Sequence, residues 1–206
     1  MTRTRCYHLG RRAARGVALI LALSALPLLQ GCFPVLAAGA GTAAMMAADR
    51  RQAEIVLGDQ RIETVASTRF SEQLRDQAHI NVTSFNYVVL LTGEAPTEQM
   101  KAEAERVVAA IPQVKSVVNE IQIAAPSTFG SRSNDTFLTG KVKAGFISAD
   151  KFTTNDVKVV TEAGVVYLMG LVSRKEGDDA TEAARSTGGV RKVVRVFEYI
   201  SAAPGR

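Results

Sequence analysis

The sequence predicts an α+β fold made of two tandem αββαβ units, each a three-stranded mixed sheet packed against two helices. The first observation is an internal repeat, because residues 88–93 (VVLLTG) match residues 165–170 (VVYLMG) at an offset of 77. The second is that helical and β-branched apolar segments alternate in the same order in both copies. A unit of roughly 65 residues has a marginal core. We therefore expect the units to be stabilised by packing on each other or on a membrane.

Each element can be justified from its pattern. The first helix is expected at residues 61–73 and 135–149, and an amphipathic second helix at 97–110 and 174–187. The strands are expected at 80–84, 87–93 and 114–123 in the first unit, and at 157–161, 165–172 and 190–200 in the second. The Glu162-Ala163-Gly164 turn suits a tight antiparallel hairpin. The last strand follows a crossover helix, so it must pair in parallel.

The first 31 residues have the order of a bacterial secretory signal. Five arginines come first, an apolar stretch covers residues 17–29, and Leu29-Gln30-Gly31-Cys32 follows, which resembles a lipobox. Lipidation of Cys32 would tether the chain to a membrane facing the periplasm. Phe33 is not the Asp that marks inner-membrane retention, so outer-membrane residence is expected. A signal cut near Ala37-Ala38 and a transmembrane anchor are the alternatives.

These patterns divide the chain into five parts. We expect a signal peptide at 1–31, the lipidated Cys32 with a flexible Ala/Gly-rich tether at 32–58, a first domain at 59–125, a linker at 126–133 and a second domain at 134–201.

The charge pattern argues against nucleic acid as a partner. The chain has 25 Lys plus Arg and 20 Asp plus Glu, but five of the arginines precede Cys32, so the processed chain has a formal charge of 20 − 20 = 0. Residues 53–125 have 6 bases and 10 acids (net −4), whereas residues 126–206 have 12 bases and 9 acids (net +3). The second half is therefore the better candidate for contact with an anionic surface.

No signature of catalysis, metal binding or cofactor binding is found in the sequence. Cys6 is lost with the signal, Cys32 would be lipidated, and His79 is the single histidine that follows the signal. The glycines at 140 and 145 have the spacing of a P-loop, but Phe146 stands where that motif needs Lys. We expect no enzyme, no catalytic residue, no metal site and no cofactor.

Several short segments resemble the outer-membrane lipoproteins that have two BON domains. They are residues 29–32 (LQGC), 80–83 (INVT), 118–121 (VNEI), 133–136 (SNDT) and 168–172 (LMGLV). The resemblance implies a non-enzymatic monomer on the periplasmic side of the outer membrane, which supports envelope integrity and concentrates at division sites. It also implies that the first helix of the second BON domain binds anionic phospholipid (phosphatidylglycerol or cardiolipin). That family commonly has Trp where Phe137 stands here.

The helix expected at 135–149 has two faces. Leu138, Val142, Phe146 and Ala149 recur at helical spacing and form the expected core side. The expected phospholipid site comprises Asn134, Asp135, Thr136, Phe137, Gly140, Lys141, Lys143, Ala144, Ile147 and Lys151, an apolar pair framed by lysines. Asn134 or Asp135 is expected to cap the helix.

Two alternatives remain open at this point. Phe137 and Ile147 can instead pack against the first domain. The chain can instead be an envelope-stress module that binds an assembly factor or a peptidoglycan-associated protein.

Overall fold

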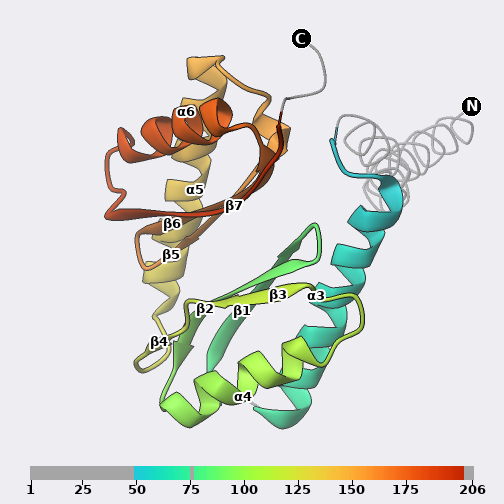
Figure 1. Ribbon diagram of the computed structural model, residues 1–206. Coiled ribbons are helices and arrows are strands. Elements are labelled where there is room, and N and C mark those ends of the chain that lie inside the picture. The colour runs from blue at the N-terminus through green and yellow to red at the C-terminus, as the bar shows by residue number, and fades with distance from the viewer. Residues whose placement is uncertain (1–48, 75–76, 202–206) are drawn as a thin grey trace, which may run out of the picture. The chain divides into compact units, whose positions relative to one another are not determined.

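The computed structural model describes residues 49–74 and 77–201. The first unit contains α3 (Ala53–Gln73), β1 (His79–Phe85), β2 (Val88–Ala95), α4 (Glu98–Ala109), β3 (Ser116–Asn119) and β4 (Gln122–Ile123). The second unit contains α5 (Phe129–Ala149), a 3₁₀ turn (Thr154–Asp156), β5 (Val157–Glu162), β6 (Val165–Val172), α6 (Arg174–Arg185) and β7 (Lys192–Tyr199). The predicted α+β class and the repeated αββαβ order are confirmed (Figure 1).

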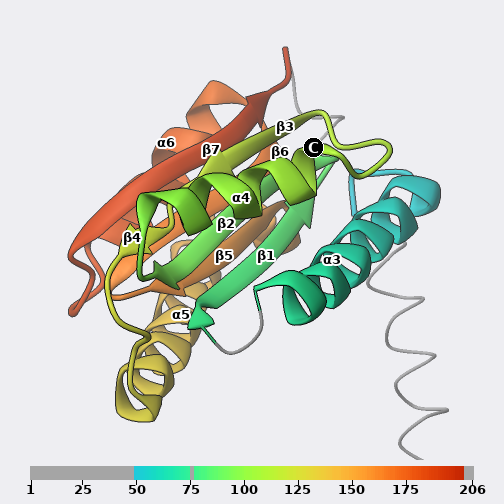
Figure 2. The same ribbon diagram turned by 90° about the horizontal axis from the view of Figure 1, so that it is seen from below.

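Each unit has one mixed sheet, as predicted. β1 pairs with β2 antiparallel, and β2 pairs in parallel with β3 and β4 (Figure 2). In the second unit β5 pairs with β6 antiparallel and β6 pairs with β7 in parallel. The helices α4 and α6 supply the crossovers that parallel pairing requires.

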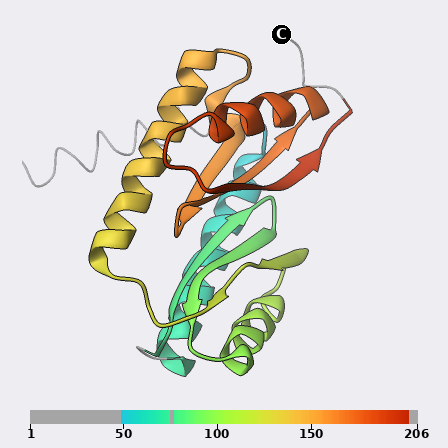
Figure 3. The same cartoon turned by 90° about the vertical axis from the view of Figure 1, so that its left-hand side faces the viewer.

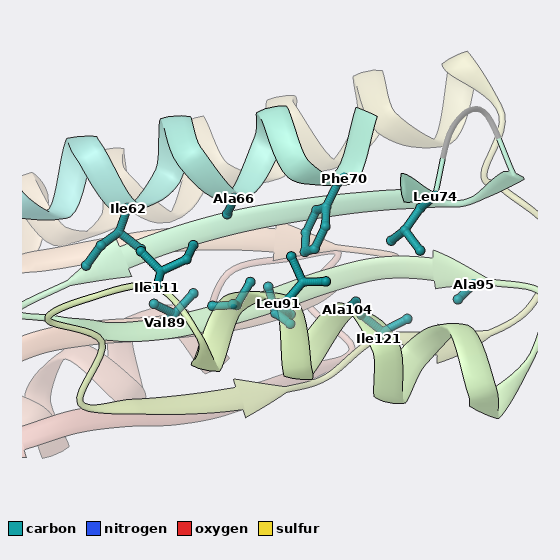
Figure 4. Close-up of a cluster of buried hydrophobic side chains, with 12 residues drawn as sticks. Ile62, Ala66, Phe70, Leu74, Val89, Leu91, Ala95, Ala104, Ile111 and Ile121 are labelled. Carbon is teal, nitrogen blue, oxygen red and sulfur yellow. The ribbon is translucent and has the colours of Figure 1, made fainter. Parts of the chain in front are cut away.

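A separate hydrophobic core lies under the helices of each unit. In the first unit Ile62 and Phe70 of α3 point toward Val89 and Leu91 of β2, and Val108 of α4 joins the same cluster (Figure 4). The core of the second unit includes Val142 and Phe146 of α5, Val166 and Leu168 of β6, and Ala180 of α6. No helix within the described ranges is both long and apolar enough to cross a membrane.

The two units are joined by a third apolar cluster, which draws on both sheets. Its buried members are Phe85 and Leu90 of the first unit and Tyr167 and Met169 of the second. Polar contacts surround this cluster: Asn81 Nδ2 donates to Glu162 at 2.8 Å, Asn86 Nδ2 to Glu198 at 2.8 Å and Lys158 Nζ to Glu63 at 2.9 Å. The expected packing of one unit on the other is therefore present.

A buried aspartate holds the hairpin turn of each unit. In the first, Asp59 accepts hydrogen bonds from the backbone N–H groups of Asn86 and Tyr87, both at 2.8 Å. In the second, Asp135 accepts from Ala163 at 2.9 Å and from Gly164 at 2.8 Å. All four turn residues have positive φ, as a two-residue hairpin turn requires. The helix and the hairpin are thereby fixed to each other.

The first helix begins earlier than predicted. α3 starts at Ala53 rather than at residue 61, so residues 53–58, which were assigned to the tether, are helical. Gly58 lies within this helix and packs closely, because a Cβ there would lie 2.6 Å from the Tyr87 ring. Arg51 also forms an ion pair with Asp59, which ties the chain before the helix to its second turn.

The helix of the second unit also begins early. α5 starts at Phe129 rather than at residue 135, so the last five residues of the expected linker 126–133 are helical. Thr128 is the N-cap, and its side chain accepts from the N–H of Ser131 at 3.3 Å. The expected cap at Asn134 or Asp135 is therefore wrong, because both residues lie inside the helix.

The predicted last strand of the first unit, 114–123, is split into β3 and β4. Between them the chain bends to bury Ile121 completely. Asn119 supports the bend, since its side chain donates to the Lys101 carbonyl at 3.1 Å and accepts from the N–H of Ile121 at 3.3 Å. The counterpart β7 has no such break and runs unbroken from Lys192 to Tyr199.

Candidate functional site

The inner side of α5 is fully committed to the core of the second unit. Leu138, Val142 and Phe146 are buried at 3%, 0% and 0% exposure, as predicted. Ala149, also expected on this side, is half-buried at the end of the helix. The helix ends at Ala149, and Asp150 follows as the C-cap in the left-handed conformation. The position of α5 is therefore set by one side alone.

The outer side of α5 presents three large apolar residues. Phe129 is 79% exposed, Phe137 67% and Ile147 69%. Phe129 and Ile147 are 18 residues apart, which is about five helical turns, so they point the same way with about 27 Å between them along the axis. Phe137 lies between them along the helix and is turned by about 80° around the axis from both, at 100° per residue. In Figure 3 no other element lies against the outer side of α5, the helix drawn in yellow to orange. We call these three residues the α5 apolar row.

The three predicted lysines have different surroundings. Lys141 lies with its Nζ 5.9 Å from the centre of the Phe137 ring and also donates to the Gly188 carbonyl. Lys151 is 3.8 Å from Asp179 of α6, which partly neutralises its charge. Within the described part of the chain Lys143 forms no ion pair or hydrogen bond. Lys141 and Lys143 therefore flank the apolar row with available charge, whereas Lys151 is partly committed to α6.

The small and polar residues of the predicted site divide into exposed and buried members. Asn134, Thr136, Gly140 and Ala144 are exposed, and a Cβ at Gly140 would meet nothing within 4 Å. Asp135 is different: it is only 5% exposed, and both its carboxylate oxygens accept from the β5–β6 turn. Asp135 thus holds the fold together and does not contribute to the outer surface.

Sequence reasoning missed Phe129, the most exposed large apolar residue of the described chain. Residues 126–133 are rich in Ser and Gly, which favoured a linker there. The signal that could have revealed it is Thr128, because Thr is a favoured N-cap residue.

The expected alternative, in which Phe137 and Ile147 pack against the first unit, is wrong, because more than two thirds of each side chain is exposed. Cys32, the expected lipidation site, and the signal 1–31 lie outside the described residues.

The exposed side of α5 has the chemistry of a helix that lies in a membrane interface. Its large side chains are apolar, its central positions are small, and its flanking charges are positive. The three apolar side chains are spread over about 27 Å of the helix, so they are not confined to one end.

Comparison with known proteins agrees with this architecture. A family model for the BON domain matches residues 58–125 and 134–201. Outer membrane lipoprotein DolP of Haemophilus influenzae is 30% identical over 184 residues, which is 88% of this chain and 95% of that protein. The 21 kDa hemolysin of Actinobacillus pleuropneumoniae is 34% identical over 154 residues, 74% of this chain and 79% of that protein. Osmotically-inducible protein Y of Escherichia coli is 31% identical over 117 residues, 55% of this chain and 58% of that protein.

Proposed function

The chain belongs to the BON-domain family, and from this premise we propose that it is a non-enzymatic outer-membrane lipoprotein whose second BON domain binds anionic phospholipid through α5. The observation that supports the lipid site most directly is the α5 apolar row. Three large apolar side chains are exposed on a helix whose other side is packed, and positive charge flanks them. Exposed apolar residues on one side of a helix that polar and positive residues surround are typical of a surface that meets a membrane interface.

The energies favour surface binding over insertion. Full burial of a Phe or Ile side chain contributes about 1.5–3 kcal/mol, and partial burial at an interface contributes less. Each lysine near an anionic surface adds about 1 kcal/mol. These terms give modest affinity, which becomes effective when an anchor already holds the domain near the membrane.

The anchor in this proposal is Cys32. The likeness to Outer membrane lipoprotein DolP covers 95% of that protein, and Leu29-Gln30-Gly31-Cys32 supplies the motif. Two or more acyl chains hold a protein stably on a membrane, whereas one does so only marginally. Mass spectrometry of membrane-extracted protein should find residue 32 as the acylated N-terminus, and an unmodified Cys32 would refute this part of the proposal.

The lipid site is tested with residues 33–206, which lack the anchor, on phosphatidylglycerol and phosphatidylcholine vesicles. We expect binding to the anionic vesicles alone, and its loss when Phe129, Phe137 and Ile147 are all changed to Ala. Leu57→Ala is the matched control, because Leu57 is 60% exposed on α3 of the first domain. A folded triple variant that binds like the parent would overturn the proposal and would favour a protein partner.

The contribution of the lysines to vesicle binding is tested by measuring binding at different salt concentrations. Screening shortens the reach of exposed charges to about 10 Å at 0.1 M salt. Lys141→Gln and Lys143→Gln, each made alone, should therefore weaken binding mainly at low salt. Lys151→Gln should weaken it less, because Asp179 already lies 3.8 Å from that ammonium group. Equal effects of all three lysines would contradict this part of the site.

At the level of the cell, we propose that this lipid contact supports envelope integrity and places the protein at division sites. A strain that produces only the α5 triple variant should show the permeability of a deletion strain and should lose the division-site signal of a fluorescent fusion. Normal localisation of that variant would assign recruitment to a protein contact.

A further inference from the structure

Three side chains with metal-binding atoms meet where the two domains contact each other. His79 and Glu94 are opposite partners on β1 and β2 of the first domain, and Glu162 ends β5 of the second. One ligand atom from each residue lies within 4.8 Å of the other two, and His79 Nδ1 is 3.2 Å from Glu94 Oε2. Sequence reasoning did not predict this group, because its members are far apart in the chain.

The two carboxylates are buried without a fixed cation. Glu94 and Glu162 are each 6% exposed. Over residues 49–74 and 77–201, no Lys or Arg forms an ion pair with either of them, and His79 is the one basic partner of Glu94. Two other buried acids have an arginine partner, Asp59 with Arg51 and Asp156 with Arg50, whereas the buried Asp135 accepts two backbone hydrogen bonds. A pair of uncompensated buried carboxylates is costly unless a cation joins them.

The donors that reach these two carboxylates are neutral groups apart from His79. Asn81 Nδ2 donates to Glu162 Oε2 at 2.8 Å. The backbone N–H of Ser127 donates to Glu94 Oε2 at 3.0 Å. The buried hydroxyl oxygen of Ser127 has no hydrogen-bond partner in the described part of the chain.

We propose that His79, Glu94 and Glu162 bind a divalent transition-metal ion, and that Zn²⁺ fits this donor set best. Two ligand atoms roughly 2.1 Å from one tetrahedral Zn²⁺ lie roughly 3.4 Å apart. The His79–Glu94 separation of 3.2 Å already meets this requirement, and a rotation of the Glu162 side chain brings in the third ligand. Ca²⁺ and Mg²⁺ need more ligands, all of them oxygen, so the imidazole nitrogen disfavours them.

The position of the site gives the ion an entry route and a structural role. A cavity of about 230 Å³, lined in part by His79 and Glu162, opens beside the ligands and leaves room for a bound water as fourth ligand. Arg132 also lines this cavity, and its Nη1 donates to the Ser127 carbonyl at 3.1 Å. Because the ligands come from both domains, the ion would join the domains and fix the base of α5, whose Thr136 lines the same cavity.

The test is calorimetric titration of the untagged full-length protein with Zn²⁺ near neutral pH, with thermal unfolding alongside. We expect one micromolar site that Mg²⁺ and Ca²⁺ do not fill at millimolar concentration, and a Tm that rises by several degrees with Zn²⁺. His79→Ala and Glu162→Gln should each weaken this site at least tenfold and remove the Tm rise. Zinc held elsewhere on the chain would survive both changes.

Glu63→Gln is the matched control. It removes the Glu63–Lys158 ion pair, another contact between the domains, without touching the three ligands. Its zinc affinity should equal that of the parent. Weakening by Glu63→Gln as large as by Glu162→Gln would show that domain contact, not coordination, is being measured. The proposal is overturned by that result, by folded ligand variants that bind zinc like the parent, or by the absence of binding below 100 μM, a concentration roughly equivalent to 5.5 kcal/mol of affinity.

Discussion

The helices α3 and α5 are the same element in two copies. Most of the differences between them lie on their outer sides. Both have 21 residues and lie 76 positions apart. Their four buried positions coincide at this offset: Asp59 with Asp135, Ile62 with Leu138, Ala66 with Val142, and Phe70 with Phe146. Both copies therefore satisfy the same packing and anchoring requirements, and the fold alone does not distinguish them.

The outer positions have diverged. At the places of Phe129, Phe137 and Ile147, α3 has Ala53, Arg61 and Ser71. The outer side of α3 offers no comparable apolar row, and its Glu63 contacts Lys158 of the second domain. The comparison indicates that the residues that distinguish the two domains in function are ones that the core does not use. It also gives a direct way to test that assignment.

The largest effect is expected from the shared anchor. Asp59→Ala should lower the free energy of unfolding by about 3–5 kcal/mol, because it leaves two turn amides and the Ser84 hydroxyl without an acceptor and removes one of the two carboxylates that pair with Arg51. Asp135→Ala should lower the free energy of unfolding by about 1–3 kcal/mol, because it leaves two turn amides without an acceptor, and Asp135 has no cationic partner to lose. Urea unfolding measures both. Equal losses would contradict the distinction between the two anchors.

The next largest effect is expected when outer residues are exchanged between α3 and α5. Phe137→Arg with Ile147→Ser gives α5 the residues of α3 and should weaken binding to phosphatidylglycerol vesicles more than tenfold, as the burial of both side chains is lost. The reciprocal change, Arg61→Phe with Ser71→Ile in that variant, should restore part of the binding. Circular dichroism must show all proteins folded. Undiminished binding by the first variant would place the lipid site elsewhere.

A smaller effect on stability is expected from the difference between the crossover helices α4 and α6. Thr97 caps α4, whereas Ser173 and Glu176 cap α6 with a capping box, and Glu176 also binds Arg50 at 2.7 Å. The hydrogen bond from Arg50 lowers the pKa of Glu176 from 4.5 to about 2. A carboxyl whose pKa is lower in the folded protein stabilises it above the unfolded pKa, and this contribution is lost as pH falls from about 4.5 to 2.

The measurement for this pair is urea unfolding from pH 7 to pH 2. Glu176→Gln should lose about 1–2 kcal/mol at pH 7 and should depend less on pH than the parent between 4.5 and 2. Glu98→Gln in the first turn of α4 is the control, because it keeps the Thr97 cap. A parent-like pH slope in Glu176→Gln would refute the assigned role of Arg50.

The sequence was sufficient for the parts of the fold that depend on local pattern. The strand at 165–172 was predicted to the residue, because its unbroken apolar run ends at a Gly-bearing turn and at Ser173. The core side of α5 followed from the spacing of Leu138, Val142 and Phe146. These features depend on periodicity, which is visible without tertiary contacts.

The features that were missed depend on contacts between distant residues. The Ala/Gly-rich composition up to residue 58 favoured a tether, but Gly58 is helical and lies so close to the Tyr87 ring that a Cβ would be 2.6 Å from it. Asp135 suggested a cap, but it bonds to a turn 28 residues later. His79 has no metal-binding or catalytic partner near it in the sequence, but the pairing of β1 with β2 places it opposite Glu94. Pairings of this kind are set by topology, so no local pattern reveals them.

The smallest expected effect refines the same comparison with a fluorescent probe. The chain has no Trp, so Phe137→Trp introduces a single indole on the outer side of α5. Trp favours the headgroup level because its ring is apolar and its N–H can donate there. Binding to phosphatidylglycerol vesicles should tighten a few-fold, and the emission should shift to the blue. Arg61→Trp places the same probe at the matching position of α3 and should show no shift. Equal shifts from both positions would mean that the two outer sides meet the membrane alike, and the division of roles between the domains would then be wrong.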